Sequence, residues 1–290
     1  MINFLVTHNH RYTMDVFLPA IDPGVAAEIR VIPYDALRRA APPPGQYLFA
    51  DLERLGARGL QRATRIAWRA RQRFGGAPVN DPERSLRRFE LLRKLWNDGR
   101  NRFNAYRPAD GESPGRYPVF VRHEKHHDGA LTGLLADRDA LDVALADLQR
   151  SGHSLGGLLV VEYLDASDEA GVFWKYGAFR IGEAIIPRHV FRGRSWVLKD
   201  PDLRDDATAA AEEAFLEQNP HEARLREIFD LACIQYGRID YAVVDGTIQV
   251  WEINTNPVLV KLNPNPTRSR NRALFLARAE AAFRDLLNAQ

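Results

Sequence analysis

A predicted β-hairpin over residues 238–257 constrains the fold of this 290-residue chain more than any other segment. Two apolar runs flank an Asp-Gly pair at 245–246, and this pattern favours a tight turn between antiparallel strands. Asp240 begins the first strand, whereas Glu252 and Asn254 end the second and share one face because strand side chains alternate with period two. The turn brings these strand ends together, so we expect the three polar side chains to converge.

The converging side chains have the chemistry of a metal site. Asp240, Glu252 and Asn254 offer hard oxygen ligands of the kind that hold Mg²⁺ at nucleotide phosphates. The plain alternative is a hairpin with polar residues at its ends. Two details favour the metal interpretation: Glu252 lies in an apolar run, where an unpaired carboxylate is costly, and Asn-Thr-Asn-Pro at 254–257 ends the strand abruptly.

The composition is that of an ordinary globular protein. Hydrophobic residues make up 45% of the chain, charged residues 27%, and the net charge of +2 does not indicate a binder of polyanions. The single cysteine, Cys233, excludes an internal disulfide framework, is compatible with a reducing cytoplasm, and has apolar neighbours that predict a packed helix position. Residues 1–6 show no signal-peptide pattern, and no apolar run approaches the roughly 20 residues that span a bilayer. We therefore expect a cytoplasmic protein without nucleic-acid or membrane partners.

Alternating strand and helix patterns predict a chain of mixed α/β and α+β class. Strands at 2–6, 29–33 and 46–50 and a helix at 60–74 indicate a small α/β domain over residues 1–83. Further helices are predicted at 83–97, 137–150, 206–217, 222–236 and 268–288, and further strands at 117–122, 158–163, 172–179 and 181–187. The arginines of residues 58–73 spread around their helix, which favours a solvated face over a nucleic-acid surface.

A cation and a polar loop follow another predicted strand. Arg122 ends the strand and precedes the loop 123–129, where charge and backbone N–H groups could hold phosphate oxygens. A solvated surface loop is the alternative. His126 and His127 do not indicate zinc, because adjacent side chains on an extended segment diverge and no cysteine or further histidine follows at a useful spacing.

Two other regions carry polar residues whose interpretation stays open. The strand ending at residues 162–165 could offer backbone groups to an adenine and a carboxylate to a ribose hydroxyl, or be a plain strand end. Cations are dense around the strands at 172–187, where a solvated surface is the default. If those strands face the hairpin, some of the cations would stabilise charge on a transferring phosphoryl group. They are Lys175, Arg180, Arg188, His189, Arg192, Arg194 and Lys199.

The order of these features resembles the ATP-grasp superfamily, in particular the branch with glutathione synthetase and the ligases that add glutamate to the ribosomal protein S6 tail. The resemblance covers residues 80–257, and its most specific motif is Asp240 followed by Glu252-Ile-Asn254. It implies an ATP-grasp fold, two α+β subdomains clasping ATP, over residues 84–290 with a lid at about 118–187, preceded by the small α/β domain. The implied cofactors are ATP and two Mg²⁺ ions, with Mn²⁺ as an alternative, held by the hairpin triad.

The resemblance also implies roles for individual residues. The implied nucleotide contacts are Arg88, Arg122, Glu162, Tyr163, Leu164 and Asp165, with the first two on phosphates, the next three at adenine and the last at ribose. Arg188, assisted by Lys175 or Lys199, would act catalytically by stabilising the transferred group. The chain departs from the family where arginines replace both phosphate-binding lysines, because arginine binds phosphate as a fork rather than a point. The loop also has only one glycine, Gly129, and Val258 stands where many relatives have glycine.

The implied activity is an ATP-dependent ligase that joins a carboxylate to an amine, or less often a thiol, through an acyl phosphate. Two alternatives stay open: an ATP-grasp kinase that phosphorylates a sugar or polyol hydroxyl, and a nucleotide-binding module without catalysis. The expected partners are small-molecule or peptide carboxylates and amines, and relatives commonly assemble as homo-oligomers. The loop at residues 261–272 either contacts an anionic substrate or is solvated.

Overall fold

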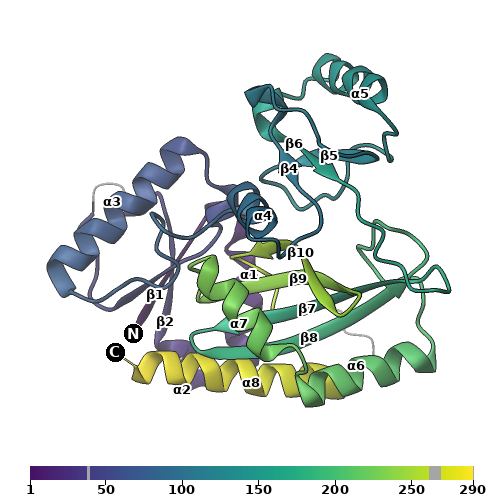
Figure 1. The fold of residues 1–290 in the computed structure, drawn as a ribbon. Helices are drawn as coiled ribbons and strands as arrows, with labels where there is room; N and C mark the ends of the chain where they lie inside the picture. The colour runs from purple at the N-terminus through teal and green to yellow at the C-terminus, as the bar shows by residue number, and fades with distance from the viewer. Residues whose placement is uncertain (38–39, 261–268, 290) are drawn as a thin grey trace.

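The computed structural model describes residues 1–37, 40–260 and 269–289 (Figure 1). The strands are β1 (Ile2–Val6), β2 (Ile29–Pro33), β3 (Gln46–Phe49), β4 (Ala105–Tyr106), β5 (Val119–His123), β6 (Leu158–Glu162), β7 (Phe173–Ile181), β8 (Ala184–Gly193), β9 (Tyr236–Val244) and β10 (Thr247–Asn254). The α-helices are α1 (Tyr12–Phe17), α2 (Pro23–Ala27), α3 (Ala57–Phe74), α4 (Arg88–Asn97), α5 (Arg138–Arg150), α6 (Asp206–Gln218), α7 (Glu222–Leu231) and α8 (Ser269–Asn288). Short 3-10 helices are η1 (His8–His10), η2 (Leu18–Ala20), η3 (Leu52–Arg54), η4 (Pro108–Asp110) and η5 (Leu155–Gly157).

The N-terminal sheet is parallel, has the order β2-β1-β3 and is covered on both faces. Side chains of β1 alternate between the faces, so Phe4 and Val6 join a core with α1 and α8, while Leu5 packs with the buried face of α3. Burial on both faces explains why β1 is apolar at nearly every position. The predicted small α/β unit is therefore present in the structure.

The second sheet is antiparallel, has the order β4-β6-β5 and lies apart from the others beneath α5 (Figure 1). We call residues 105–162 the lid. One face of its sheet packs on Leu141 of α5. Leu159 and Val161 on the other face pack with Leu92 and Phe103. The lid therefore has its own small core and turns its second face toward the rest of the protein.

The third sheet is antiparallel, with the order β10-β9-β7-β8. Helices α4, α6 and α7 pack on one face, and α8 and the N-terminal sheet pack on the other. Asp245 and Gly246 both have positive φ (48° and 71°), as the predicted two-residue turn between β9 and β10 requires. Pro187 interrupts no pairing inside the sheet because β8 is an edge strand.

The predicted class, mixed α/β and α+β, is confirmed, and the structure adds several sheets; some predicted boundaries differ. Strand β7 and the first four residues of β8 fall inside the predicted lid range 118–187. These strands pair with each other and β7 pairs with β9, so they belong to the third sheet. Helix α4 begins at Arg88 rather than 83, because residues 85 and 86 bond to the backbone of the turn after α7. Cys233 lies in that turn with φ 53°, not in a packed helix.

None of the helices in the described part of the chain is both long and apolar enough to cross a bilayer.

Asn80 joins the N-terminal sheet to the third sheet. It is fully buried and its φ is 55°. Its Nδ2 donates to the carbonyl oxygens of Phe49 (3.1 Å) and Tyr236 (2.7 Å), and its Oδ1 accepts from the N–H groups of Gln235 (2.8 Å) and Tyr236 (2.9 Å). One side chain thus satisfies four backbone groups at the junction.

Replacing Asn80 with alanine is expected to lower the free energy of unfolding by about 3 kcal/mol, because buried backbone groups would lose their partners. The effect is measured by urea unfolding followed by circular dichroism. Asn97→Ala, at an exposed position at the end of α4, is the matched control and should change stability little. Equal midpoints for the two variants would contradict this role of Asn80.

Candidate functional site

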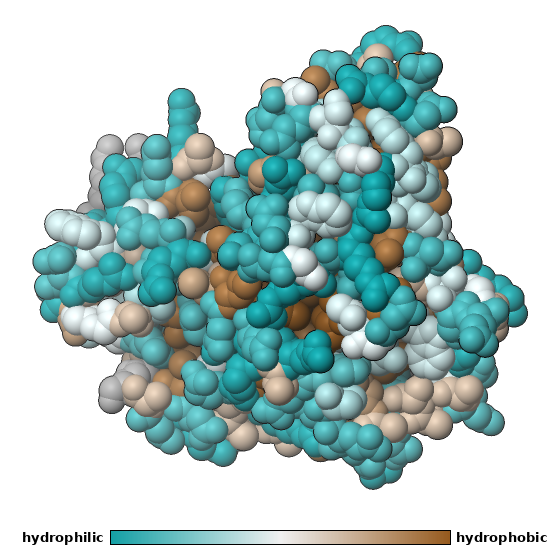
Figure 2. Space-filling model, viewed as in Figure 1, coloured by the Kyte–Doolittle hydropathy of each residue, from teal (hydrophilic) through white to brown (hydrophobic). Residues whose placement is uncertain are grey.

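A cavity of about 330 Å³ lies between the lid and the third sheet. In the same orientation as the ribbon, Figure 2 shows hydrophobic surface in the recess below the lid, with hydrophilic residues around it. Its aromatic and aliphatic lining includes Leu92, Phe103, Phe120, Val161, Tyr163, Leu164, Trp174, Trp196 and Trp251. Its charged lining comprises Arg122, Lys175, Lys199, Arg238, Asp240 and Glu252. The cavity therefore combines apolar walls that fit a flat ring with a cluster of charges.

A β-bulge sets the carboxylates of the cavity on one face. The register shifts between Val250 and Glu252, so that Glu252 lies directly opposite Asp240. Without the extra residue, Trp251 would take that place and Glu252 would point to the other face. With it, Trp251 and Glu252 both line the cavity. The structure thus brings together two of the residues predicted to bind metal.

Asn254, the third member of the predicted triad, follows Glu252 by two residues and is buried. Its Oδ1 accepts a hydrogen bond from the N–H of Asn256 at 2.8 Å. The donor set of two opposed carboxylates and an amide oxygen fits a hard divalent cation such as Mg²⁺. The assignment of these residues to a metal stays a prediction.

Both carboxylates are paired with cations. The Asp240 carboxylate accepts two hydrogen bonds from the Arg238 guanidinium, with N···O distances of 2.7 and 3.2 Å. It also lies 3.8 Å from Lys175 Nζ. Glu252 Oε2 accepts from Arg88 Nη2 (2.5 Å) and Arg122 Nη2 (3.0 Å). The site therefore holds more positive than negative charge, which suits a polyanionic ligand.

The pKa values of this cluster follow from burial and charge. Burial alone would raise the pKa of Glu252, but Arg88, His127 and Arg122 hold it well below its usual range. Burial, with a smaller effect of Arg88, lowers the pKa of Arg122 to about 10, so its guanidinium stays charged at neutral pH. Glu252 and Arg122 are therefore both charged near pH 7.

Arg88 holds the loop at residues 123–129, which we call the phosphate loop. Its side chain is 1% exposed, and Nη1 donates to the carbonyl oxygens of His123 (3.1 Å), Glu124 (2.5 Å) and His126 (2.8 Å). Arg88 does not line the cavity. The sequence predicted a direct contact between Arg88 and phosphate. In the structure, the Arg88 guanidinium donates to the loop carbonyls and to Glu252. Arg88 and the loop are far apart in sequence, so this role could not be predicted from the sequence.

Lys199 closes over the phosphate loop from the other side. A Cβ built on Gly129, whose φ is +90°, would lie 2.6 Å from Lys199 Cε. Glycine at this position therefore allows both the backbone conformation and the approach of the lysine. Lys175 and Lys199 both line the cavity, and their catalytic role stays a prediction. Arg188 does not; its guanidinium lies 4.6 Å from the Phe275 ring centroid, and its predicted role is untested.

The predicted adenine and ribose contacts are only partly at the cavity. Tyr163 and Leu164 line it. The Glu162 carboxylate instead accepts hydrogen bonds from Tyr106 Oη (2.9 Å) and from the Asn104 N–H (3.1 Å), so it supports the lid. Asp165 accepts from Ser167 in a local turn and is absent from the lining. Of the loop at residues 261–272, positions 261–268 lie outside the described residues.

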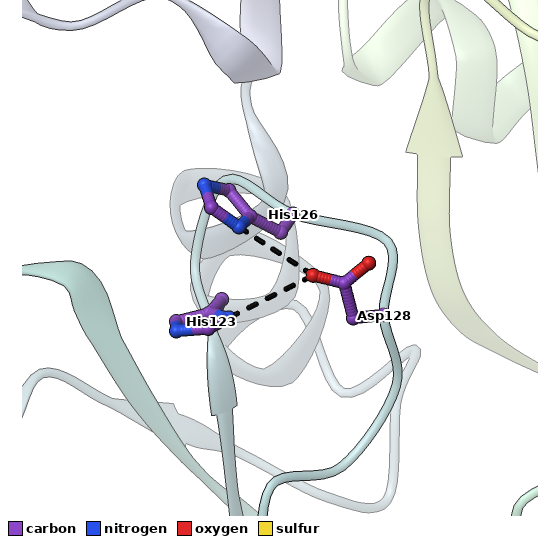
Figure 3. Close-up of side chains that lie close together, drawn as sticks. All are labelled: His123, His126 and Asp128. Carbon is purple, nitrogen blue, oxygen red and sulfur yellow. Dashed lines mark ion pairs between the residues drawn. The ribbon is translucent and has the colours of Figure 1, made fainter. Parts of the chain in front are cut away.

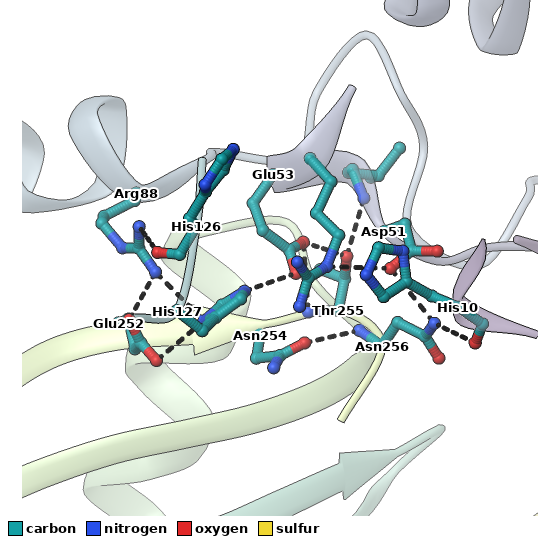
Figure 4. Close-up of polar contacts among 12 residues, drawn as sticks. His10, Asp51, Glu53, Arg88, His126, His127, Glu252, Asn254, Thr255 and Asn256 are labelled. Atoms are coloured by element: carbon teal, nitrogen blue, oxygen red, sulfur yellow. Dashed lines mark hydrogen bonds and ion pairs between the residues drawn. The ribbon is translucent and has the colours of Figure 1, made fainter. Parts of the chain in front are cut away.

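A second polar cluster ties the N-terminal sheet to the hairpin end (Figure 4). Glu53 follows β3, is 3% exposed, and accepts from Thr255 Oγ1 at 2.5 Å. His127 lies between Glu53 Oε1 (3.3 Å from Nε2) and Glu252 Oε1 (3.1 Å from Nδ1). Asp51, with φ 57°, accepts from Thr7 and Asn256. Through His127, the phosphate loop thus contacts both the third sheet and the segment that follows the N-terminal sheet.

Sequence reasoning missed three residues of the site. Arg238 could have been found, because it precedes Asp240 by two positions and therefore shares its strand face. His127 belongs to the loop already singled out, but its partners come from distant segments. Glu53 carries no local signal beyond its position after a strand.

Three solved structures resemble this chain over nearly its whole length. D-alanine–D-alanine ligase from Bacillus anthracis, in complex with ATP, has 13% sequence identity, a TM-score of 0.52, and coverage of 99% of this chain and 98% of that chain. A RimK-domain ATP-grasp protein from Sphaerobacter thermophilus has 15% identity, a TM-score of 0.53, and coverage of 99% and 100%. D-cycloserine synthetase DcsG has 15% identity, a TM-score of 0.54, and coverage of 96% and 100%.

No family model matches the chain, and no curated protein matches it by sequence. At these identities the structural likeness establishes the fold.

The pH dependence of stability should report the charge on His127. Burial alone would lower the pKa of His127, but Glu252 and Glu53 raise it above its usual 6.5. Because the pKa of His127 is higher in the folded than in the unfolded state, protonated His127 stabilises the fold. This contribution is fully present below pH 6.5 and is lost as the pH rises through the folded-state pKa. In EDTA and without nucleotide, the stability advantage of wild type over His127→Asn should therefore shrink from pH 6.5 upward. An advantage that stays constant or grows would contradict this charge state.

Proposed function

We propose that this chain, which has the ATP-grasp fold, is an ATP-dependent ligase that joins a carboxylate to an amine. One observation carries the proposal: the bulge in β10 sets Glu252 opposite Asp240, at the edge of a cavity that also holds Arg122, Lys175 and Lys199. Carboxylates for a metal and cations for phosphates, beside an apolar pocket for a base, are the groups that phosphoryl transfer from ATP requires.

The lining of the cavity supports one orientation of the nucleotide. The rings of Phe120 and Trp196 lie 4.9 Å apart, and those of Phe103 and Trp251 lie 4.8 Å apart. These apolar walls would contact the adenine, together with Tyr163 and Leu164. The phosphates would then point toward Arg122, Lys175 and Lys199, where their charge is neutralised.

Asp240, Glu252 and Asn254 would hold Mg²⁺ at the phosphates. When bound, the ion would neutralise phosphate charge and orient the transferred group. Arg238, Arg122 and Lys175 now pair with the two carboxylates, and phosphate oxygens are alternative partners for the same cations.

The proposed reaction has two steps. An oxygen of the substrate carboxylate attacks the γ-phosphorus of ATP, and the bond from this phosphorus to the bridging oxygen breaks. ADP departs, and the product of this step is an acyl phosphate. The amine nitrogen then attacks the acyl carbon, phosphate leaves, and the nitrogen loses a proton to form the amide. Lys175 and Lys199 would stabilise the transferring phosphoryl group, and the lid would exclude water from the labile anhydride. Arg188 remains a further candidate for this stabilisation.

The assay for this proposal measures ADP and inorganic phosphate together, against a panel of acids with and without amines. Equal amounts of ADP and phosphate, formed only when an acid and an amine are both present, are the expected result. ADP without phosphate in the presence of sugars or polyols would instead indicate a hydroxyl kinase. Measurable Mg²⁺-dependent ATP binding with no product on any panel would indicate a binding module.

Glu252→Gln should lower kcat/KM for ATP by about 100-fold or more, because the substitution removes a carboxylate needed at the phosphates. Glu169→Gln, at an exposed position of a loop, is the matched control and should leave kcat/KM unchanged. Since Glu252 also balances two arginines, Asp240→Asn is measured in parallel, and circular dichroism verifies folding. Near-normal kcat/KM in both folded site variants would refute the assigned roles.

A further inference from the structure

We propose that His123, His126 and Asp128 form a second metal site, for a divalent transition-metal ion, on the outer face of the phosphate loop (Figure 3). Each residue offers one ligand atom, and these atoms lie within 4.8 Å of one another. Figure 3 shows both imidazole rings beside the Asp128 carboxylate. The residues follow one another at spacings of three and two, so a single loop supplies all three ligands.

The present distances are close to those of a metal centre. Asp128 Oδ2 lies 3.5 Å from His126 Nδ1 and 4.0 Å from His123 Nδ1. Ligand atoms around tetrahedral zinc are roughly 3.4 Å apart, given metal–ligand bonds of about 2.1 Å. The His126 and Asp128 side chains are 60% and 71% exposed, so they can make this small adjustment without disturbing the core.

His123 is already oriented as a ligand. Its Nδ1 is buried and has no hydrogen-bond partner among the described residues. Its other nitrogen, Nε2, lies 3.1 Å from His153 Nδ1. A neutral His123 ring that donates from Nε2 to His153 keeps a lone pair on Nδ1, facing the other two ligands. A hydrogen bond from the ring nitrogen that does not bind the metal commonly fixes the tautomer of a metal-binding histidine.

The donor set selects the class of ion. Two imidazoles and one carboxylate suit Zn²⁺, Co²⁺ or Ni²⁺, with a fourth position left for water, whereas Mg²⁺ prefers oxygen ligands. The site is separate from the Asp240–Glu252 pair because adjacent side chains on the loop diverge. His127 turns inward to Glu252, while His126 turns outward to His123 and Asp128. Because the side chains of His126 and His127 point to opposite sides of the loop, they cannot bind one metal together. The same divergence places His126 beside His123, where the two can share a metal.

A metal here would hold the phosphate loop from outside. Arg88 already binds the backbone carbonyl groups of His123 and His126 from inside. A metal on the side chains of the same two residues would fix the loop that carries His127 and follows Arg122. Metal binding is therefore expected to reduce opening of residues 122–130.

The test is a titration of untagged, EDTA-treated protein with Co²⁺, in the presence of excess Mg²⁺ to occupy the hairpin triad. One equivalent should produce the visible absorption of imidazole-bound Co²⁺, and Zn²⁺ should displace it. His126→Ala and Asp128→Asn should each weaken Co²⁺ binding about tenfold or more. His8→Ala removes an exposed histidine elsewhere and should have no effect. Lack of a Co²⁺ band in wild type, or unchanged affinity in both ligand variants, would overturn the site.

Hydrogen exchange supplies a second measurement that does not depend on enzyme activity. Zn²⁺ should slow exchange in residues 122–130 of wild type but not of the His126→Ala variant. Equal exchange with and without Zn²⁺ in wild type would overturn the inferred control of the loop. Because His126 and Asp128 are exposed, their replacement should leave the melting profile of the metal-free protein unchanged, which verifies that the variants fold.

Discussion

The buried carboxylate of Glu252 is the charge on which the arrangement of the site depends. Moving an ion from water into the protein is costly unless partners satisfy it, and Glu252 finds three cationic or polar partners: Arg88, Arg122 and His127. They come from α4, from the end of β5 and from the phosphate loop, while Glu252 belongs to the third sheet. One carboxylate therefore ties the lid to the third sheet, in addition to the apolar contacts of Leu159 and Val161. A nucleotide and its metal would have to replace these interactions with others of equal strength.

Polar contacts also tie the N-terminal sheet to the other two sheets. Glu53 reaches both Thr255, beside the hairpin end, and His127, in the phosphate loop. Asn80 satisfies backbone groups of the N-terminal and third sheets at once. Because these contacts are polar and directional, they specify one orientation of the three sheets relative to one another. The apolar core shared by α8 and β1 mainly provides stability.

Much of the fold and part of the site could be predicted from the sequence, because both rest on local patterns. The Asp-Gly turn predicted the hairpin and the meeting of its strand ends, so Asp240 and Glu252 were expected together and are together. The bulge at Trp251, which turns Glu252 to the face of Asp240, was not predicted. Roles that depend on distant segments could not be read in this way. Arg88 lies far in sequence from the loop carbonyls that it binds, and β7 shows no local sign that it pairs with β9 rather than with the lid. A start of α4 at Arg88 likewise depends on bonds to a turn over 140 residues away.

The bulge at Trp251 makes the length of β10 as important as its composition. Because a strand alternates on either side of a bulge, loss of one residue between the turn and the bulge, with the bulge kept, would exchange the two faces of everything beyond it. The carboxylate would then enter the apolar core beneath the sheet, and Ile253 would take its place in the cavity. Point substitutions in this strand can be compensated nearby, but a change of one in its residue count cannot. Conservation of spacing, more than of any single side chain, should therefore identify homologues that keep a working site.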